Sequence, residues 1–303
     1  MLNYIVLIIG FIMLIKGADV FVESASCVAK KFGIPSIIVG LTIVAMGTSA
    51  PEFSVSVQSA LAGMNDMSIA NVVGSNIFNL LVVLGISSMV GKLKINNYRD
   101  IIIMFITGLS MLICSMDGLL NLFDGLVLLT LFIAYIISLI VKAYKEKYDD
   151  NEDYKRSMTI SICLGIIGLV AIVWGGDLVV NAASNISQQL GMSENLIGLT
   201  VVALGTSLPE LVTSVVATKK GELDIAIGNV VGSNIFNILL ILGSAAAINP
   251  MTVSYFAFLD LLFVIGAMFT FIMLTYNDKT LSKAKGLPLI LMYVVYMIFT
   301  IIR

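Results

Sequence analysis

Two short segments of the chain carry the same oxygen-bearing side chains inside stretches that are otherwise apolar. Gly47–Glu52 reads GTSAPE and Gly205–Glu210 reads GTSLPE. Proline lacks an N–H group and its ring crowds the carbonyl four residues earlier, so we expect backbone carbonyls around Ala45 to Thr48 to be left without helical partners. Such carbonyls are costly in lipid and must face protein or water. Each segment therefore predicts a cluster of carbonyl, hydroxyl and carboxylate oxygens.

A second repeated motif supplies further oxygens. NVVGSNIFN occurs at Asn71–Asn79 and again, unchanged, at Asn229–Asn237. Its serine and last asparagine are four residues apart and share one helix face. The middle asparagine, Asn76 or Asn234, is expected to bond helix to helix more often than it holds an ion, and the first asparagine to be structural. The candidate ligands are Ala45 through its carbonyl, Thr48, Ser49, Glu52, Ser75 and Asn79, and in the second copy Ala203, Thr206, Ser207, Glu210, Ser233 and Asn237.

These atoms suit a hard cation. The set is all oxygen, and the chain has no histidine and only three isolated cysteines. Ca²⁺ takes 6–8 oxygen ligands in flexible geometry and Na⁺ also fits such a set, whereas softer metals would need nitrogen or sulfur. One Ca²⁺ or two Na⁺ would neutralise Glu52 and Glu210. An empty site would leave two charges near mid-membrane, each costing at least about 2.5–3.5 kcal/mol, so we expect coupled exchange of the two ions.

The elements that must hold these residues are apolar helices. Of the 303 residues, 59% are hydrophobic and 12% charged, against roughly 25% charged in soluble domains. Apolar runs of about 20 residues, long enough to span a bilayer, recur along the chain. We predict an all-α polytopic membrane protein with ten transmembrane helices, at residues 3–25, 36–61, 69–90, 101–116, 123–142, 159–181, 195–218, 224–248, 256–276 and 287–302.

The positive charges define an orientation. Apart from Lys16 and Arg303, every Lys and Arg follows an odd-numbered span. Positive loops face the cytoplasm, so both termini are predicted to be extracellular. The charged segment 143–158 is expected to be a cytoplasmic linker, because its acidic residues lack the EF-hand spacing of a Ca²⁺ sensor. Within the first span, Lys16 and Asp19 are expected to pair.

The two halves of the chain are related in sequence. At an offset of 158 residues, Asp19 matches Asp177 and Asp66 matches Asp224, without a gap from about residue 17 to residue 90. The repeat unit contains five spans, and an odd number inverts the second copy in the membrane. We therefore predict two inverted-topology five-helix repeats, 1–142 and 159–303, facing each other around the candidate ligands. Such repeats are typical of secondary transporters.

The paired motifs resemble the sodium/calcium exchanger family of the cation/Ca²⁺ exchanger superfamily, in its prokaryotic form without a regulatory domain. The resemblance covers essentially the whole chain and rests on GTSAPE…GSNIFN and GTSLPE…GSNIFN. It implies exchange of Na⁺ for Ca²⁺ across the plasma membrane by alternating access. It also implies a central Ca²⁺ site formed by Glu52, Glu210, Thr48 and Thr206. A Na⁺ site would flank it on each side: one formed by Ala45, Thr48, Ser75 and Glu52, the other by Ala203, Thr206, Ser233 and Glu210. Asn79 and Asn237 would line the middle of the site.

The resemblance also bears on the driving ion. Some relatives, including the K⁺-dependent branch, carry Asp where this chain has Asn237, which argues against K⁺ co-transport. The H⁺/Ca²⁺ branch typically has a Gly-Asn-x-x-Glu core, whereas this chain has Thr48-Ser49 and Thr206-Ser207, which favours Na⁺. An H⁺/Ca²⁺ or other divalent-cation antiporter is the alternative. A channel is disfavoured by the single-chain repeat, and an enzyme by the absence of GxGD, GxSxG and a histidine base.

We expect no cofactor beyond the transported Na⁺ and Ca²⁺. The expected partners are these ions and the lipid bilayer; nucleic acid is not expected, no protein partner is required, and a monomer is compatible with the sequence. The predicted location is the plasma membrane of a prokaryote, as a multi-pass protein.

Overall fold

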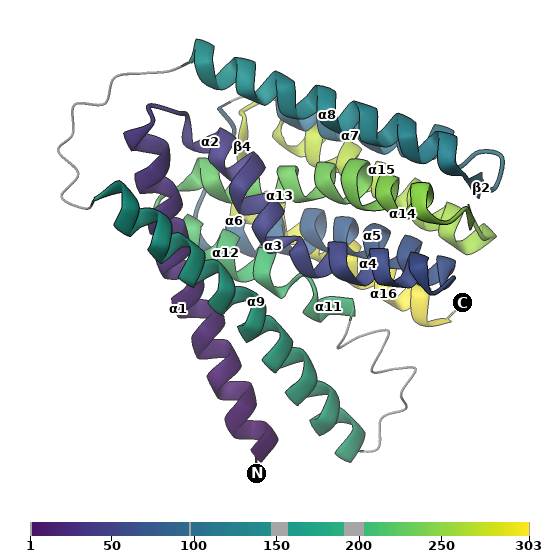
Figure 1. Cartoon of the computed structure of the whole chain (residues 1–303), viewed down its shortest axis with the longest axis horizontal. Coiled ribbons are helices and arrows are strands. Elements are labelled where there is room, and N and C mark those ends of the chain that lie inside the picture. Colours follow the sequence, from purple (N-terminus) through teal and green to yellow (C-terminus); the bar gives the residue numbers. More distant parts are fainter. Residues whose placement is uncertain (1, 97, 147–156, 191–202, 303) are drawn as a thin grey trace.

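Long helices dominate the molecule. The computed structural model describes residues 2–96, 98–146, 157–190 and 203–302, and the strands in these ranges are four two-residue segments (Figure 1). Within the same ranges, seven helices are long and apolar enough to cross a membrane, and a pair of helices bent by 50° makes an eighth candidate. The chain is therefore an all-α polytopic membrane protein.

The helices lie where hydropathy predicts them. In chain order they are α1(Leu2–Lys31), α2(Ser36–Val39), η1(Gly40–Val44), α3(Ala45–Thr48), α4(Ala50–Leu61), α5(Asn65–Phe78), η2(Asn79–Val83), α6(Leu84–Val90), α7(Arg99–Cys114), α8(Leu122–Lys145), α9(Met158–Gln189), α11(Ala203–Gly205), α12(Leu208–Lys219), α13(Leu223–Phe236), η4(Asn237–Leu242), α14(Gly243–Ile248), α15(Tyr255–Thr275) and α16(Lys283–Ile302). Segments named η are π-helical turns within longer helices. Most of the predicted linker 143–158 and the start of the predicted span 195–218 lie outside the described residues.

The helices α1 and α9 lie side by side and project away from the other helices (Figure 1). They run antiparallel, because Gly10 meets Gly175 while Gly17 meets Gly168. A Cβ atom added at Gly17 would lie 2.8 Å from the Gly168 carbonyl oxygen, and one added at Gly168 would lie 2.8 Å from the Gly17 carbonyl oxygen. Small residues let membrane helices approach closely, so these glycines set the separation of α1 and α9.

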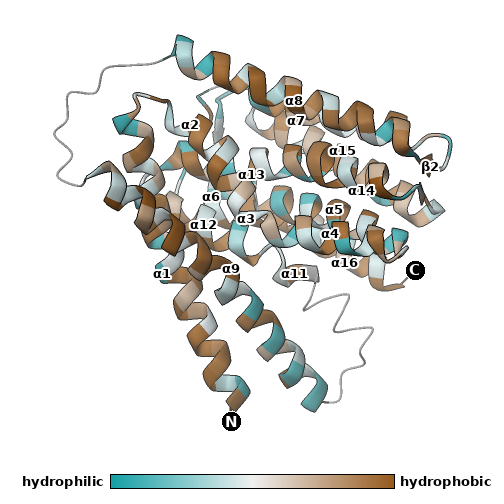
Figure 2. Cartoon of the chain, viewed as in Figure 1, coloured by the Kyte–Doolittle hydropathy of each residue, from teal (hydrophilic) through white to brown (hydrophobic). Residues whose placement is uncertain are grey.

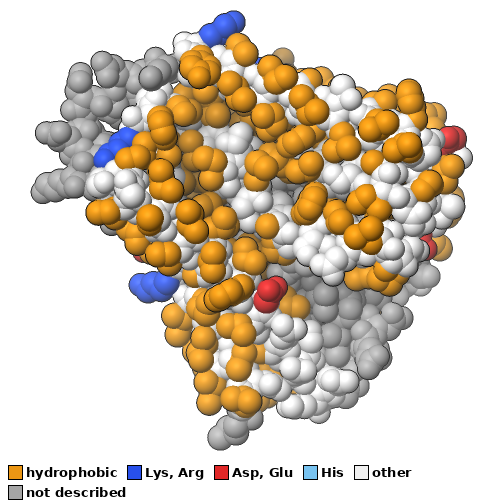
Figure 3. Space-filling model, viewed as in Figure 1, with side chains coloured by type: hydrophobic (Ala, Val, Ile, Leu, Met, Phe, Trp, Pro, Cys, Tyr) orange, Lys and Arg blue, Asp and Glu red, His pale blue; other side chains and the backbone are white. Residues whose placement is uncertain are grey.

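The core of the molecule lies around α13 and α14, and the outer helices expose apolar side chains. The most apolar window of α13–α14 is 94% buried, against 22% for α8 and 11% for α16. Hydrophobic residues run along the outer helices (Figure 2), and the face shown in Figure 3 carries few charged side chains. An apolar surface around a polar interior is the arrangement that lipid requires.

The two halves repeat element by element. The bounds of α4 and α12 differ by 158 residues, as do those of α5 and α13. Each half also contributes one strand to each of two small antiparallel sheets. β1(Leu93–Lys94) pairs with β4(Thr280–Leu281), and β2(Leu119–Leu120) pairs with β3(Met251–Thr252). The sheets therefore tie one half to the other at two places.

Two charged residues have partners that local spacing does not indicate. Asp19, expected beside Lys16, instead binds Lys220, whose Nζ lies 2.9 Å from Asp19 Oδ1. Lys142 is buried at the end of α8, and its Nζ lies 2.9 Å from Asp100 Oδ2. In both pairs the partner belongs to another helix. The buried Lys142 needs such a partner because taking a charge out of water is costly, whereas the pair of Asp19 and Lys220 is partly exposed.

Candidate ion-binding site

A break in the helix positions each GTSxPE motif. Ser49 separates α3 from α4, and the helical segments on its two sides are bent by 50°. Pro51 and Pro209 lie in the first turns of α4 and α12, where a missing N–H breaks no helical hydrogen bond. The expectation of a free carbonyl at Ala45 is wrong, because this oxygen accepts the backbone N–H of Ser49 at 3.0 Å. After the π turn η1, helical hydrogen bonding thus continues as far as Ser49, where the chain bends.

Glu52 and Glu210 are held crosswise by serines of the opposite half. Ser49 Oγ donates to Glu210 Oε1 at 2.7 Å, and Ser207 Oγ donates to Glu52 Oε1 at 3.0 Å. All four residues are at most 3% exposed. The two GTSxPE motifs therefore meet at one buried place between the halves.

The serines of the second motif lie against the same carboxylates. Ser75 Oγ donates to Glu52 Oε1 at 3.4 Å. Ser233 Oγ lies 3.5 Å from Glu210 Oε1 and 3.5 Å from the Ala45 carbonyl oxygen. Each glutamate is thus approached by a serine from each half.

Asn71 and Asn229 hold the backbone of the first motif in place. Asn71 Nδ2 donates to the Glu52 carbonyl oxygen at 3.1 Å and to Ser56 Oγ at 2.8 Å. Asn229 Nδ2 makes the matching bonds in the second half, at 3.3 Å to the glutamate carbonyl and 2.9 Å to Ser214 Oγ. The structural role expected of these asparagines is confirmed. The sequence analysis did not identify Ser56 and Ser214. The signal was present, because Ser56 follows Glu52 by four residues and Ser214 follows Glu210 by four residues.

Several buried oxygens around the glutamates have no hydrogen-bond partner among the described residues. They are Glu52 Oε2, Glu210 Oε2, Asn79 Oδ1, Asn234 Oδ1, Asn237 Oδ1 and Thr206 Oγ1. Leaving a buried polar group unpaired costs about 1–3 kcal/mol, and more for a charged group. A cation that accepts 6–8 oxygen ligands would satisfy such a set.

The asparagines of the second motif divide into two kinds. Asn79 begins the π turn η2 and Asn237 begins the π turn η4, a distortion that is frequent at functional sites. Asn237 Nδ2 donates to Asn76 Oδ1 at 3.3 Å, a bond between the halves. Asn234 Nδ2 donates to the Val230 carbonyl oxygen of its own helix at 2.8 Å. Asn76 therefore makes the helix-to-helix bond expected of it, whereas Asn234 bonds its own helix and does not. The amide oxygens of Asn79, Asn234 and Asn237 have no partner among the described residues.

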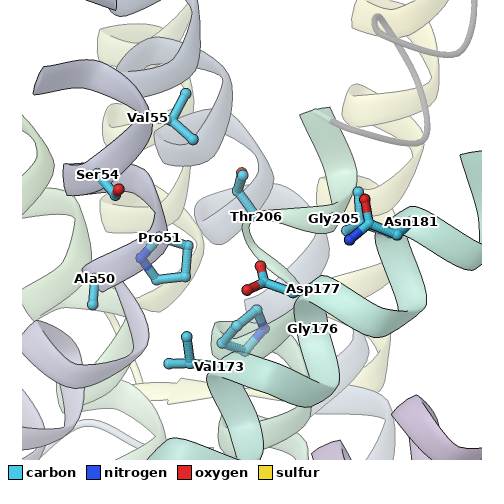
Figure 4. A pocket seen from close by; sticks show the side chains of 12 residues that line it. Ala50, Pro51, Ser54, Val55, Val173, Gly176, Asp177, Asn181, Gly205 and Thr206 are labelled. Carbon is cyan, nitrogen blue, oxygen red and sulfur yellow. The ribbon is translucent and has the colours of Figure 1, made fainter. Parts of the chain in front are cut away.

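The threonines of the two motifs have different surroundings. Thr48 is fully buried, and its Oγ1 lies 3.0 Å from Asn229 Oδ1 and 3.1 Å from the Val44 carbonyl oxygen. Thr206 instead lines a cavity of about 330 Å³ between α4, α9 and α12 (Figure 4). Pro51 and Pro209, which directly precede the glutamates, form part of its wall. One predicted ligand, Thr206, therefore lines this cavity, and the two glutamates do not.

The site can bind a hard cation although few of its ligands carry a formal charge. No cluster of three or more His, Cys, Asp or Glu occurs in the described part of the chain, so neutral oxygens must complete any coordination sphere. Ala203 begins α11, directly before the second motif. The remaining predicted ligands take part in the hydrogen bonds or the unpaired oxygens described above.

Comparison with known proteins identifies the family of the chain. The model of the sodium/calcium exchanger protein family matches residues 2–141 and 160–302. The chain is 34% identical to the inner membrane protein YrbG of Escherichia coli (strain K12), with 80% of this chain and 79% of the relative covered. It is 29% identical to the sodium/calcium exchanger MaX1 of Methanosarcina acetivorans, with 98% and 97% covered.

The likeness extends to the fold. A solved structure of the sodium-calcium exchanger NCX_Mj superposes with a TM-score of 0.88 at 28% identity, covering 97% of each chain. The apolar helices and this match identify the chain as a multi-pass membrane protein of the prokaryotic exchanger type, for which the plasma membrane is the expected location. The family consists of transporters, not of enzymes. The chain belongs to the sodium/calcium exchanger protein family, and its activity is that of a cation/Ca²⁺ antiporter.

Proposed function

We propose that this chain exchanges Na⁺ for Ca²⁺ by alternating access, with the ions bound between its two halves. The observation that carries the proposal is the state of Glu52 and Glu210. Each has one carboxylate oxygen bonded to a serine of the other half and one without a partner among the described residues. One Ca²⁺ or two Na⁺ would neutralise the pair, so the two loads compete. Two uncompensated charges within the membrane are costly, which favours exchange over net transport.

The proposed ligands are the oxygens that the two repeats bring to this place. Ca²⁺ would lie between the two glutamates, and Na⁺ would occupy flanking positions. The Ala45 carbonyl would use its second lone pair, because the Ser49 amide occupies the first. The full set is Ala45, Thr48, Ser49, Glu52, Ser75 and Asn79 with Ala203, Thr206, Ser207, Glu210, Ser233 and Asn237.

Na⁺ is favoured over H⁺ as the driving ion. Hydroxyl and amide oxygens, which bind Na⁺ but do not titrate near neutral pH, make up most of the set. The relatives point the same way: MaX1 is named a sodium/calcium exchanger, and the NCX_Mj structure was soaked with 2.5 mM Na⁺ and 0.1 mM Ca²⁺. The second candidate is an H⁺/Ca²⁺ antiporter, because Glu52 and Glu210 alone could carry two protons.

We also propose that the chain crosses the membrane ten times, in two inverted five-helix repeats at residues 1–142 and 159–303. The linker 143–158 joins the repeats, and both termini are extracellular. Two observations support this topology. The equivalent helices α1 and α9 run antiparallel, as inverted copies must. Each small sheet also joins segments assigned to one side: β1 and β4 follow the third and ninth predicted spans, and β2 and β3 follow the fourth and eighth.

Transport by the purified protein tests the proposal. Liposomes containing the protein and loaded with Na⁺ are diluted into Na⁺-free buffer, and ⁴⁵Ca²⁺ uptake is measured with and without an imposed pH gradient. Glu52→Gln and Glu210→Gln keep the shape of the side chain and remove its charge. Glu146→Gln makes the same change at the exposed end of α8 and serves as the control.

We expect uptake that requires the Na⁺ gradient, ignores the pH gradient, disappears in both site variants and persists in the control. Uptake driven by the pH gradient alone would assign the protein to the second candidate. Uptake that survives in Glu52→Gln or Glu210→Gln would remove the paired glutamates from the mechanism.

A further inference from the structure

We infer that Asp177 and Asn181 on α9 form an outer binding position for a hydrated cation, at the mouth of the cavity that leads to the central site. The inference deepens the proposed function and rests on it. Asp177 and Asn181 are exposed, lie one helical turn apart on the same face, and both line the cavity.

The cavity connects this position with the central site. Figure 4 shows the Asp177 carboxylate pointing into the cavity between Thr206 and Pro51. The volume of about 330 Å³ holds on the order of ten water molecules, so a cation can enter with part of its hydration shell. Thr206, a proposed ligand, lines the same cavity, and its buried Oγ1 has no hydrogen-bond partner among the described residues.

Asp177 is the one charged side chain among the described residues that line the cavity. It has no ion pair or hydrogen bond with any described residue. Its charge is therefore not compensated within the described part of the protein, although it lies at the entrance of a cleft with mainly apolar walls. A carboxylate in this setting attracts cations strongly.

At the matching positions of the first half, the acidic side chains have a cationic partner. Asp19 and Glu23, which match Asp177 and Asn181, both bind Lys220, at 2.9 Å and 3.4 Å. The residue that matches Lys220 in the first half is Ala62. The repeat thus pairs the acidic position with a lysine in the first half, whereas the second-half position, which lines the cavity, has no cationic partner among the described residues.

The physical effect of such a position is on capture. A cleft lined by one sign of charge raises the local concentration of counter-ions and their association rate about 10- to 10³-fold. The effect is screened by salt, since the Debye length is about 10 Å at 0.1 M ionic strength. Asp177 should therefore lower the Ca²⁺ concentration needed for half-maximal transport from the cavity side without setting the maximal rate.

The test uses right-side-out membrane vesicles from cells producing the full-length protein, with vesicles from cells lacking it as background. Initial rates of ⁴⁵Ca²⁺ uptake into Na⁺-loaded vesicles are measured over a range of external Ca²⁺. We expect Asp177→Asn to raise the half-saturating Ca²⁺ about 3- to 10-fold with the maximal rate within about twofold. Asp177→Glu and Ser54→Ala, the second a neutral change in the same cavity, should behave as wild type.

A salt titration separates an electrostatic role from a structural one. Raising the ionic strength with choline chloride to about 0.5 M should bring wild type and Asp177→Asn together. The inference is overturned if Asp177→Asn has the same half-saturating Ca²⁺ as wild type. It is also overturned if Asp177→Glu transports more slowly than wild type by the same factor at every Ca²⁺ concentration, or if the difference in half-saturating Ca²⁺ between wild type and Asp177→Asn persists in high salt. If wild-type uptake needs no Na⁺ gradient, the proposed function fails. The half-saturating Ca²⁺ of wild type and of Asp177→Asn is then compared under the gradient that does drive uptake, so the inference is still tested.

Discussion

At the scale of single residues, the crosswise serines determine how the glutamates are held. Ser49 donates to Glu210 and Ser207 donates to Glu52, so alanine at either serine removes a donor from a buried carboxylate. A hydrogen bond to a charged group contributes about 1.5–3 kcal/mol, which corresponds to a factor of about 10 or more in binding. We expect Ser49→Ala and Ser207→Ala each to raise the half-saturating Ca²⁺ about 10-fold or more, measured as ⁴⁵Ca²⁺ uptake into Na⁺-loaded liposomes.

The control for this prediction is Ser88→Ala. The Ser88 hydroxyl is buried but bonds the Gly85 carbonyl oxygen of its own helix, so its loss should leave Ca²⁺ affinity unchanged. Equal effects of Ser49→Ala and Ser207→Ala are expected because the two bonds are equivalent in the repeat. A change in only one of them, or a similar change in Ser88→Ala, would count against the crosswise arrangement.

The crosswise pairing also marks the limit of what the residues predict. Spacing within a motif identifies Ser49 and Glu52 as neighbours on the chain, and the duplication identifies both copies as important. It does not say that each serine serves the glutamate of the other copy, because that contact depends on how the halves pack. The same holds for Asp19, which spacing pairs with Lys16 and the structure pairs with Lys220.

At the scale of elements, the crossing of α1 and α9 depends on glycine. A Cβ atom at position 168 would lie 2.8 Å from both the Gly17 carbonyl oxygen and the Phe21 nitrogen, which are backbone atoms that cannot rotate away. Overpacking of this kind costs about 1–3 kcal/mol. We expect Gly168→Ala to lower the thermal unfolding midpoint of the purified protein by several degrees. Gly266→Ala, at a glycine with no neighbouring atom within 4 Å, should leave it unchanged; equal midpoints for the two variants would show that the crossing tolerates a wider separation.

Hydropathy locates the helices well and their irregularities poorly. A span needs about 20 apolar residues, so runs ending at residues 25, 61 and 90 are visible in the sequence. The helices end at Lys31, Leu61 and Val90, so the first runs six residues beyond its prediction. The π turns that begin at Asn79 and Asn237 have no proline or glycine to mark them. The break at Ser49 is predicted by the nearby proline, but the hydrogen bond that keeps the Ala45 carbonyl occupied is not, because it depends on where the turn begins.

At the scale of the whole molecule, a nearly symmetric sequence adopts an asymmetric structure. Thr48 is bonded and buried, while the matching Thr206 lines a cavity. An alternating-access carrier must break its symmetry in any one state, because its site opens to one side at a time. Under the proposed alternating access, the repeat predicts both sites of entry, and the cavity lined by Thr206 marks one of them.

The orientation of the molecule gives the last prediction. The positive charges predict that the loops after odd-numbered spans are cytoplasmic, and the sheet pairs join loops assigned to the same side. With the three native cysteines replaced by alanine, Leu2→Cys and Asp117→Cys should react with an impermeant maleimide in right-side-out vesicles. Glu146→Cys should react only after the membrane is permeabilised.

Each outcome of that labelling experiment tests a separate part of the topology. The first position precedes all spans and Asp117 follows the fourth, so an even number of crossings puts both on one side. Labelling on opposite sides would mean that a span between them is missing or extra. Labelling of Glu146→Cys alone from outside would keep the span count and reverse the molecule, so that the cavity at Asp177 would open to the cytoplasm and Ca²⁺ would be captured there.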